Sequence, residues 1–98
     1  MKIIIVGYGR VGTQVFRLLS TKDHSIVIVD KDRTILEKTV EETHARVLVG
    51  DAVDPDLLRQ AGADKADVLL ALTREENTNL MVAQIARIAF KVPKVIER

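Results

Sequence analysis

Five short apolar segments alternate with segments of helical pattern along the chain, and this alternation constrains the fold more than any other feature. The apolar segments, which we expect to be strands, lie at residues 3–6, 25–29, 46–49, 68–72 and 94–97. Several are apolar at consecutive positions, as is typical of parallel strands covered on both faces. The segments between them, which we expect to be helices, lie at residues 11–19, 32–43, 54–62 and 77–90.

Strict alternation of such strands and helices predicts an α/β fold whose parallel sheet is built from right-handed crossovers. We expect a Rossmann-like doubly wound parallel sheet of five strands in the order 3-2-1-4-5. The 98 residues suffice for one compact core and leave no room for a separate substrate domain. Residues 1–98 are therefore expected to form a single domain.

The second expected helix has two candidate N-caps, Asp32 and Thr34. Its apolar residues Ile35, Leu36 and Val40 recur at helical spacing. We therefore expect all three to face the sheet.

Composition and charge exclude several classes of protein. Fifteen Lys and Arg residues against fourteen Asp and Glu residues leave a formal charge of +1, which is too balanced for a nucleic-acid-binding surface. The chain has no cysteine, so it can form no disulfide, thiolate nucleophile or cysteine-ligated metal site. His24 and His44 lie in separate turns without a second ligand at metal spacing, so no metal site is expected. No apolar segment approaches the roughly 20 residues of a membrane-spanning helix.

A glycine-rich motif stands where the first expected strand meets the first expected helix. Residues 7–12 read Gly-Tyr-Gly-Arg-Val-Gly, which matches G-x-G-x-x-G in the position where that pattern has physical meaning. Gly7 would permit a tight turn, Gly9 would let a pyrophosphate approach the backbone, and Gly12 would let the helix pack close to the strand. The free N–H groups of the helix N-terminus would then face the phosphates. The alternative is a glycine-rich turn that binds nothing.

Two aspartates follow the next strands at the same edge of the sheet. Asp30 can accept hydrogen bonds from the ribose hydroxyls of an adenosine, and it would repel a 2′-phosphate. NAD or ATP/ADP is therefore favoured over NADP, although Arg33 nearby leaves a small allowance for the phosphate. Asp51 can accept from an adenine amine. The alternatives are a solvated acid at Asp30 and a residue that only starts a turn at Asp51.

Three further polar residues are candidates for the same site. Arg10, inside the glycine motif, is expected to cover the diphosphate rather than point to water. Thr73 and Asn77 follow the fourth strand and would face the distal half of the ligand, unless either of them caps the last helix. No nucleophile with a base beside it is visible, so no catalytic residue is expected.

These motifs resemble the TrkA-N domain, also called RCK or KTN, of the cytosolic regulators of potassium channels and transporters. The resemblance covers nearly the whole chain. It rests on the glycine motif at 7–12, Asp30, Val-Gly-Asp-Ala at 49–52, the run from Gly-Ala-Asp-Lys to Ala-Leu-Thr at 62–73, and Glu-Glu-Asn at 75–77.

The resemblance implies a nucleotide-binding regulatory domain rather than an enzyme. The family binds NAD(H) in some members and ATP or ADP in others, and NAD(H) is our first expectation. The implied cofactor-binding residues are Gly7, Tyr8, Gly9, Arg10, Val11, Gly12, Asp30, Lys31, Asp51, Ala52, Thr73 and Asn77. The implied partner is an integral-membrane potassium transporter or channel subunit. The implied location is the cytoplasm, at the inner face of the membrane.

Two departures from the family pattern are visible. Asp23 stands where related sequences often have glycine, and we expect it to adopt the left-handed conformation after the first helix. The family usually continues through another strand and helix beyond the position of Arg98, which implies a short member or an excised module. Two other functions stay open: the cofactor-binding fragment of an NAD-dependent dehydrogenase, and a scaffold that only oligomerises.

The last expected helix predicts self-association. Its apolar residues spread around about 220° of a helical wheel, which is wider than one sheet-facing stripe needs. We therefore expect a homodimer or higher oligomer packed through Met81, Ile85 and Ile88. The alternative is that the small alanines let the helix sink into its own domain.

Overall fold

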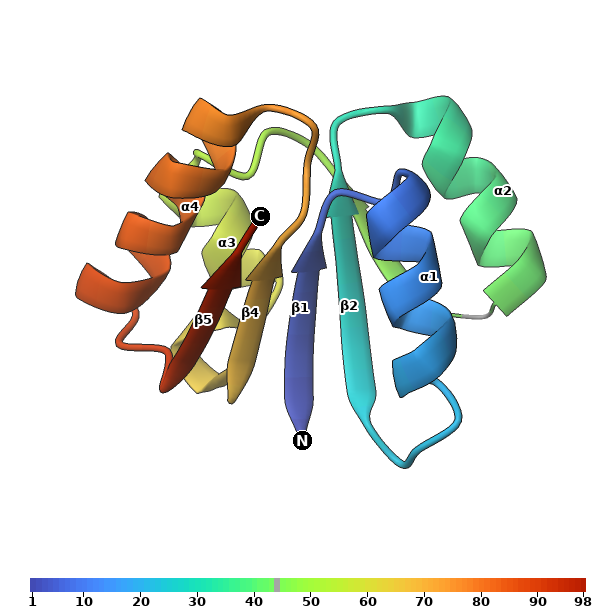
Figure 1. The fold of residues 1–98 in the computed structure, drawn as a ribbon, viewed down its shortest axis with the longest axis horizontal. Coiled ribbons are helices and arrows are strands. Elements are labelled where there is room, and N and C mark those ends of the chain that lie inside the picture. The colour runs from blue at the N-terminus through green and yellow to red at the C-terminus, as the bar shows by residue number, and fades with distance from the viewer. Residues whose placement is uncertain (44) are drawn as a thin grey trace.

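The structure is a computed structural model that describes residues 1–43 and 45–98. Its elements follow the expected alternation of strands and helices (Figure 1). In chain order they are β1 (Lys2–Val6), α1 (Arg10–Leu19), β2 (Ser25–Asp30), α2 (Arg33–Thr43), β3 (Arg46–Val49), α3 (Pro55–Gln60), the 3₁₀ helix η1 (Ala63–Lys65), β4 (Val68–Ala71), α4 (Glu76–Ile88) and β5 (Lys94–Glu97). The short helix η1 was not expected from the sequence.

Over the described residues, the strands form one parallel sheet of five in the order β3-β2-β1-β4-β5, which confirms the expected topology. In its register, Ile5 of β1 stands between Ile28 of β2 and Leu70 of β4. After β3, at one edge, the chain crosses to β4 on the other side of β1, so the loops after β1 and β4 diverge. Open α/β sheets bind ligands at such a switch point.

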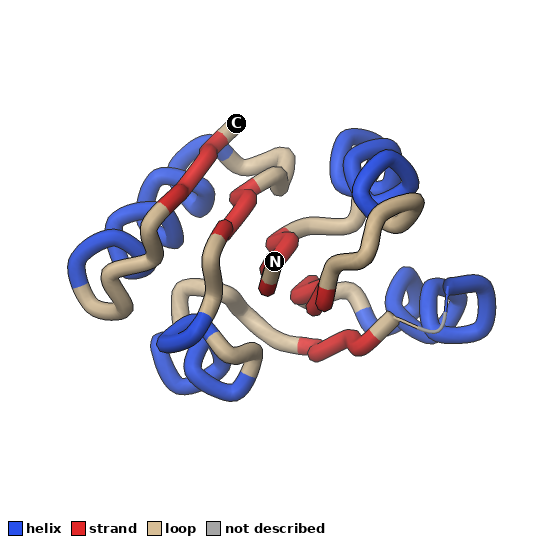
Figure 2. The backbone as a smooth tube through the Cα atoms, turned by 90° about the horizontal axis from the view of Figure 1, so that it is seen from below, coloured by secondary structure: helices blue, strands red, loops and turns tan. Residues whose placement is uncertain are grey.

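Helices cover both faces of the sheet, with α1 and α2 on one face and α3 and α4 on the other (Figure 2). On the first face, Ile5 packs in a core with Phe16 and Leu36. On the second, Ile4 packs in a separate core with Val82. Neighbouring residues of β1 thus enter different cores, which explains why the strand is apolar at consecutive positions.

Helix α2 differs from the expectation at Val40, while Ile35 is half-buried. Asp32 is its cap, because its Oδ1 accepts the Thr34 N–H at 2.9 Å. Leu36 is buried as expected, whereas Val40 is 44% exposed and Thr39 takes the buried position beside Leu36. Thr39 and Val40 are three and four residues after Leu36, and residues at both of these spacings lie near the same helical face as Leu36. The spacing alone therefore did not decide which of the two is buried. The Thr39 hydroxyl is satisfied there by donating to the backbone carbonyl four residues earlier, at 2.8 Å.

The turn after α1 also differs from the expectation. Among the described residues, Lys91 is the one non-glycine residue with a left-handed φ, so Asp23 does not adopt that conformation. The Lys22 N–H donates to the Leu19 carbonyl at 3.1 Å, and the His24 N–H donates to the Lys22 carbonyl at 3.0 Å. These bonds close the turn without a residue of positive φ.

The described residues contain no helix that is both long and apolar enough to cross a membrane. The same residues contain no group of three or more His, Asp or Glu side chains that could hold a metal ion. Nδ1 of His24 lies 3.2 Å from the amino group of Met1. The other histidine, His44, lies outside the described residues.

Candidate functional site

A cavity of about 980 Å³ opens at the carboxyl ends of the strands, around the switch point between β1 and β4. A cavity of this size is within the range of small-molecule and cofactor sites. Residues from the loops after β1, β2, β3 and β4 line it, so segments distant in sequence meet there. Those expected from the sequence are Gly7, Gly9, Arg10, Val11, Asp30, Lys31, Asp51, Ala52 and Thr73.

The three glycines of the motif differ in how much room the structure leaves for a side chain. Gly7 has φ +97, and a Cβ there would lie 2.8 Å from the Thr73 nitrogen. A Cβ on Gly12 would overlap the carbonyl oxygen of Gly7, so the first turn of α1 requires a glycine to reach the strand. A Cβ on Gly9 would meet no protein atom within 4 Å. The domain itself therefore needs Gly7 and Gly12, while the space above Gly9 is open.

Gly9 is also the N-cap of α1, and it supplies no side chain to bond the first N–H groups of the helix. The positive end of α1 thus faces the cavity beside the guanidinium-bearing residue Arg10. Backbone N–H groups and a cation at one helix N-terminus are the chemistry that binds phosphate.

Asp30 connects the glycine motif to the loop after β2. Its Oδ2 accepts the Tyr8 N–H at 2.8 Å, and its Oδ1 accepts the Asp32 N–H at 2.9 Å. The carboxylate is therefore a bonded group and not a merely solvated acid. Each oxygen still has a second lone pair, so Asp30 can accept from a ligand hydroxyl at the edge of the cavity.

Asp51 starts a turn and also lines the cavity. Its Oδ1 accepts the Val53 N–H at 3.1 Å, and its carbonyl accepts the Asp54 N–H at 3.0 Å, so it does start a turn. It also lines the cavity beside Ala52, which is 5% exposed. A carboxylate and a small side chain thus stand side by side at this end of the cavity.

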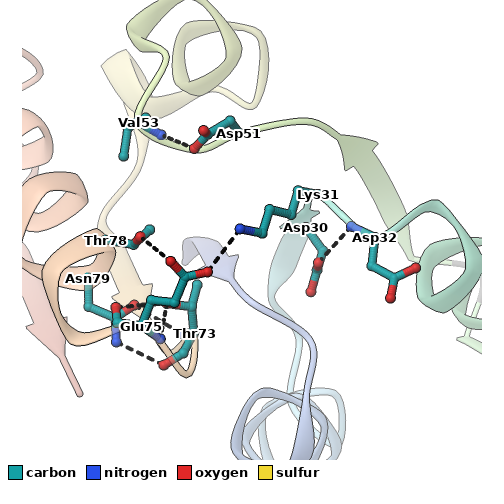
Figure 3. Close-up of polar contacts among 9 residues, drawn as sticks. All are labelled: Asp30, Lys31, Asp32, Asp51, Val53, Thr73, Glu75, Thr78 and Asn79. Atoms are coloured by element: carbon teal, nitrogen blue, oxygen red, sulfur yellow. Dashed lines mark hydrogen bonds and ion pairs between the residues drawn. The ribbon is translucent and has the colours of Figure 1, made fainter.

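Thr73 is held by a buried side chain that the sequence interpretation missed. The Thr73 N–H and hydroxyl both donate to Oδ1 of Asn79, and Nδ2 of Asn79 donates back to the Thr73 carbonyl at 2.9 Å (Figure 3). Asn79 is 1% exposed and shares its helix face with Val82, Ala83 and Ala86. An amide inside an apolar stripe requires polar partners, and that signal was present in the sequence.

The remaining expected residues lie outside the lining of the cavity. Asn77 is in the first turn of α4, which begins one residue earlier than expected, and Thr78 lines the cavity instead. Gly12 is buried in the first turn of α1. Tyr8 contributes its backbone N–H to Asp30, while its ring stacks edge-on against Phe16 with 5.8 Å between centroids.

An ion pair spans the cavity between the loops after β2 and β4. Nζ of Lys31 lies 2.9 Å from Oε1 of Glu75 (Figure 3), and the two side chains are 68% and 60% exposed. The hydrogen bond to Glu75, and then its charge, raise the pKa of Lys31; the same contacts lower the pKa of Glu75. The pair is therefore intact at neutral pH, and is lost below the lowered pKa of Glu75 or above the raised pKa of Lys31.

Charges of both signs surround the cavity. The basic residues are Arg10, Lys31, Arg74 and Arg98, and the acidic residues are Asp30, Asp32, Asp51 and Glu75. The sequence interpretation had not included Arg74 or Arg98. A ligand with anionic phosphates and neutral hydroxyls would find partners of both kinds.

A Rossmann-like sheet with a glycine motif at the switch point and an aspartate after the second strand defines the class of nucleotide-binding domains. Within that class, the sequence pattern of the TrkA-N domain matches residues 3–98, and the chain belongs to the TrkA-N family. The resemblance stated from the motifs is confirmed.

Known proteins that resemble the chain include two potassium-transport proteins. The Trk system potassium uptake protein TrkA of Vibrio alginolyticus is 38% identical over 98 residues, which are 100% of this chain and 21% of that protein. The glutathione-regulated potassium-efflux system protein KefC of Enterobacter sp. (strain 638) is 39% identical over 97 residues, 99% of this chain and 16% of that protein. The chain thus spans about a fifth of the length of these relatives or less.

A solved structure has the same fold and carries a nucleotide. The Kef CTD of Shewanella denitrificans, in an AMP-bound form, superposes with a TM-score of 0.82 at 30% sequence identity. The superposition covers 99% of this chain and 57% of that chain. The chain and this structure therefore share one fold over nearly the whole of the chain.

Proposed function

We propose that the chain is a nucleotide-binding regulatory domain that controls a potassium transporter or channel. The observation that carries the proposal is the cavity at the switch point, where the glycine motif, Asp30 and Asp51 line one continuous space. The AMP-bound relative, at 30% identity, supports an adenine nucleotide as the ligand.

The ligand that fits best is an adenine nucleotide without a 2′-phosphate, with NAD(H) as first choice and ATP or ADP as the alternative. We place the phosphates at Gly9 and Arg10, the adenosine ribose at Asp30, and the adenine near Asp51 and Ala52. Asp30 favours this class because a 2′-phosphate on the ribose would be repelled by the negative charge of the Asp30 carboxylate.

A calorimetric panel of NAD, NADH, ATP, ADP, AMP and NADP tests the ligand class. We expect at least one of the nucleotides without a 2′-phosphate to bind, and NADP to bind more weakly than its counterpart NAD. Stronger binding of NADP than of both NAD and ATP would contradict the role given to Asp30. No binding by any of the six would contradict the proposed function.

The proposed regulation follows from differential binding. A nucleotide changes the output of the domain only if it binds one arrangement of the protein more tightly than another. By analogy with the potassium-uptake and potassium-efflux relatives, the partner is an integral-membrane potassium transporter or channel subunit. In this proposal the domain acts at the cytoplasmic face of the membrane through that partner.

The relatives favour regulation over the dehydrogenase alternative. The two relatives named above align with 100% and 99% of this chain, and both carry the names of potassium-transport proteins. In addition, we propose no acid, base or nucleophile for the cavity, so the chain alone should not turn over a substrate. Steady hydride transfer from NADH to a small carbonyl compound, followed at the nicotinamide absorbance, would contradict the prediction that the chain alone has no turnover.

We also propose that copies of the chain associate through α4. Met81 and Ile88 are 53% and 75% exposed and lie about two helical turns apart on one side of the helix, whereas Ile85 is packed against its own core. Two exposed apolar side chains at this spacing suit a self-complementary contact.

Replacing Ile88 with glutamate should therefore dissociate the oligomer. Sedimentation equilibrium at tens of micromolar checks this expectation, with Leu18→Glu on α1 as the matched control. Leu18 is 74% exposed, so the control adds the same charge at an equally exposed apolar position. A monomeric parent chain, or an oligomer that Ile88→Glu leaves intact, would contradict the interface.

A further inference from the structure

The Lys31–Glu75 ion pair crosses the cavity over the carboxyl end of β1. Lys31 directly follows β2, while Glu75 is the N-cap of α4 in the loop after β4. Since β1 stands between β2 and β4 in the sheet, the pair connects the two halves of the site over the end of β1 (Figure 3). The two residues are 44 positions apart in sequence.

Adenine dinucleotides and adenine mononucleotides would occupy different parts of the cavity. A dinucleotide extends across the switch point, with its pyrophosphate at the helix N-terminus and a nucleoside on each side. Its second nucleoside must pass from the side of Asp30 and Asp51 to the side of Thr73, which is the path that the ion pair crosses. A mononucleotide needs only the first half and the phosphate position beside Gly9.

We propose that Lys31 and Glu75 form a specificity gate in the nucleotide site, which a dinucleotide must open and an adenine mononucleotide leaves closed. The proposal rests on the proposed function and deepens it. The gate lowers the affinity for dinucleotides relative to mononucleotides.

The structure shows how such a gate opens without unfolding the loop. The backbone of Glu75 is held in place, because its N–H donates to the Thr73 hydroxyl oxygen at 3.2 Å. Its second carboxylate oxygen accepts a weak 3.4 Å bond from the Thr78 hydroxyl. Both charged side chains are more than half exposed, so rotation of Lys31 or Glu75 into water breaks the pair.

The expected effect is modest, because exposed ion pairs are weak. Loss of the pair should raise the affinity for NAD relative to AMP by about two- to fivefold. Glu75 makes no side-chain cap bond to α4, so its replacement by glutamine removes the pair without removing a helix cap.

The experiment measures the Kd values of NAD and AMP by calorimetry for the parent chain, Glu75→Gln and Lys31→Gln. Both variants open the pair, but they change the charge of the site in opposite directions. The NAD preference should therefore rise in both variants. The control, Glu76→Gln, removes the same charge from an exposed neighbour in the first turn of α4 and should leave the preference unchanged.

Three outcomes would overturn the gate. An unchanged ratio of NAD to AMP affinity in Glu75→Gln would do so, and the proposed function would stand because both ligands bind. A ratio that rises in one variant and falls in the other would mean a long-range charge effect and no gate. If the parent chain bound neither NAD nor AMP, the gate would fail, and the other nucleotides of the panel would decide the proposed function separately.

Discussion

Replacing Gly12 with alanine should destabilise the domain by roughly 3 kcal/mol or more. The added Cβ would overlap the carbonyl oxygen of Gly7, which is backbone and cannot rotate away. Relief requires α1 to move off the strand, and this would separate Phe16 from the core it shares with Ile5. Chemical denaturation of the purified variant, compared with the parent chain, measures the change in free energy of unfolding.

Gly9→Ala is the matched control for this prediction. A Cβ on Gly9 meets no protein atom within 4 Å, so stability should fall by at most about 1 kcal/mol, the cost of alanine at an N-cap. Nucleotide affinity should nevertheless fall, because the methyl group occupies the space assigned to the diphosphate. Equal unfolding midpoints for Gly12→Ala and the parent chain would contradict the close packing of helix and strand.

Replacing Asp30 with alanine should weaken nucleotide binding by about ten- to a hundredfold, because a hydrogen bond to a charged group is worth roughly 1.5–3 kcal/mol. Part of the loss would come from the loop itself, since Asp30 also holds the Tyr8 and Asp32 N–H groups. Calorimetry with the best-binding nucleotide of the panel gives the total effect.

A second ligand separates the ribose contact from the loop. If the panel shows that ATP binds, 2′-deoxy-ATP should bind the parent chain more weakly than ATP, because it lacks the 2′-hydroxyl, which can donate a hydrogen bond to Asp30. In Asp30→Ala the two ligands should bind alike. If the preference for ATP persisted at full size in the variant, Asp30 would not be the ribose acceptor.

Local patterns in the sequence were sufficient to predict most of the fold. The alternation of apolar and helical segments predicted the sheet order, because covered parallel strands with right-handed crossovers leave few topologies. The helix expected at 54–62 does begin there, because the Asp54 side chain accepts the Asp56 N–H at 2.9 Å and Pro55 follows it at the first position of α3. Spacing was ambiguous where two neighbours share a helix face, as with Thr39 and Val40 in α2.

The site was predicted less completely, because its polar contacts join distant loops. The glycine motif and Asp30 are recognisable because each stands at a strand end, where the topology fixes its position. The partnership of Lys31 with Glu75 has no local signal, since it depends on how two loops approach over β1. Asn77 was expected to face the ligand because it follows the fourth strand, whereas the buried amide of Asn79, two residues later, holds Thr73.

The most direct test of the account locates the bound nucleotide on the domain. Backbone amide resonances of the isotope-labelled chain would be followed by NMR during titration with NAD, or with ATP if the panel favours it. The account predicts the largest shifts at Gly9, Arg10, Lys31 and Ala52, which line the cavity at the carboxyl ends of the strands. Shifts confined to the opposite edge of the sheet, around Ser25, Gly62 and Lys65, would contradict it.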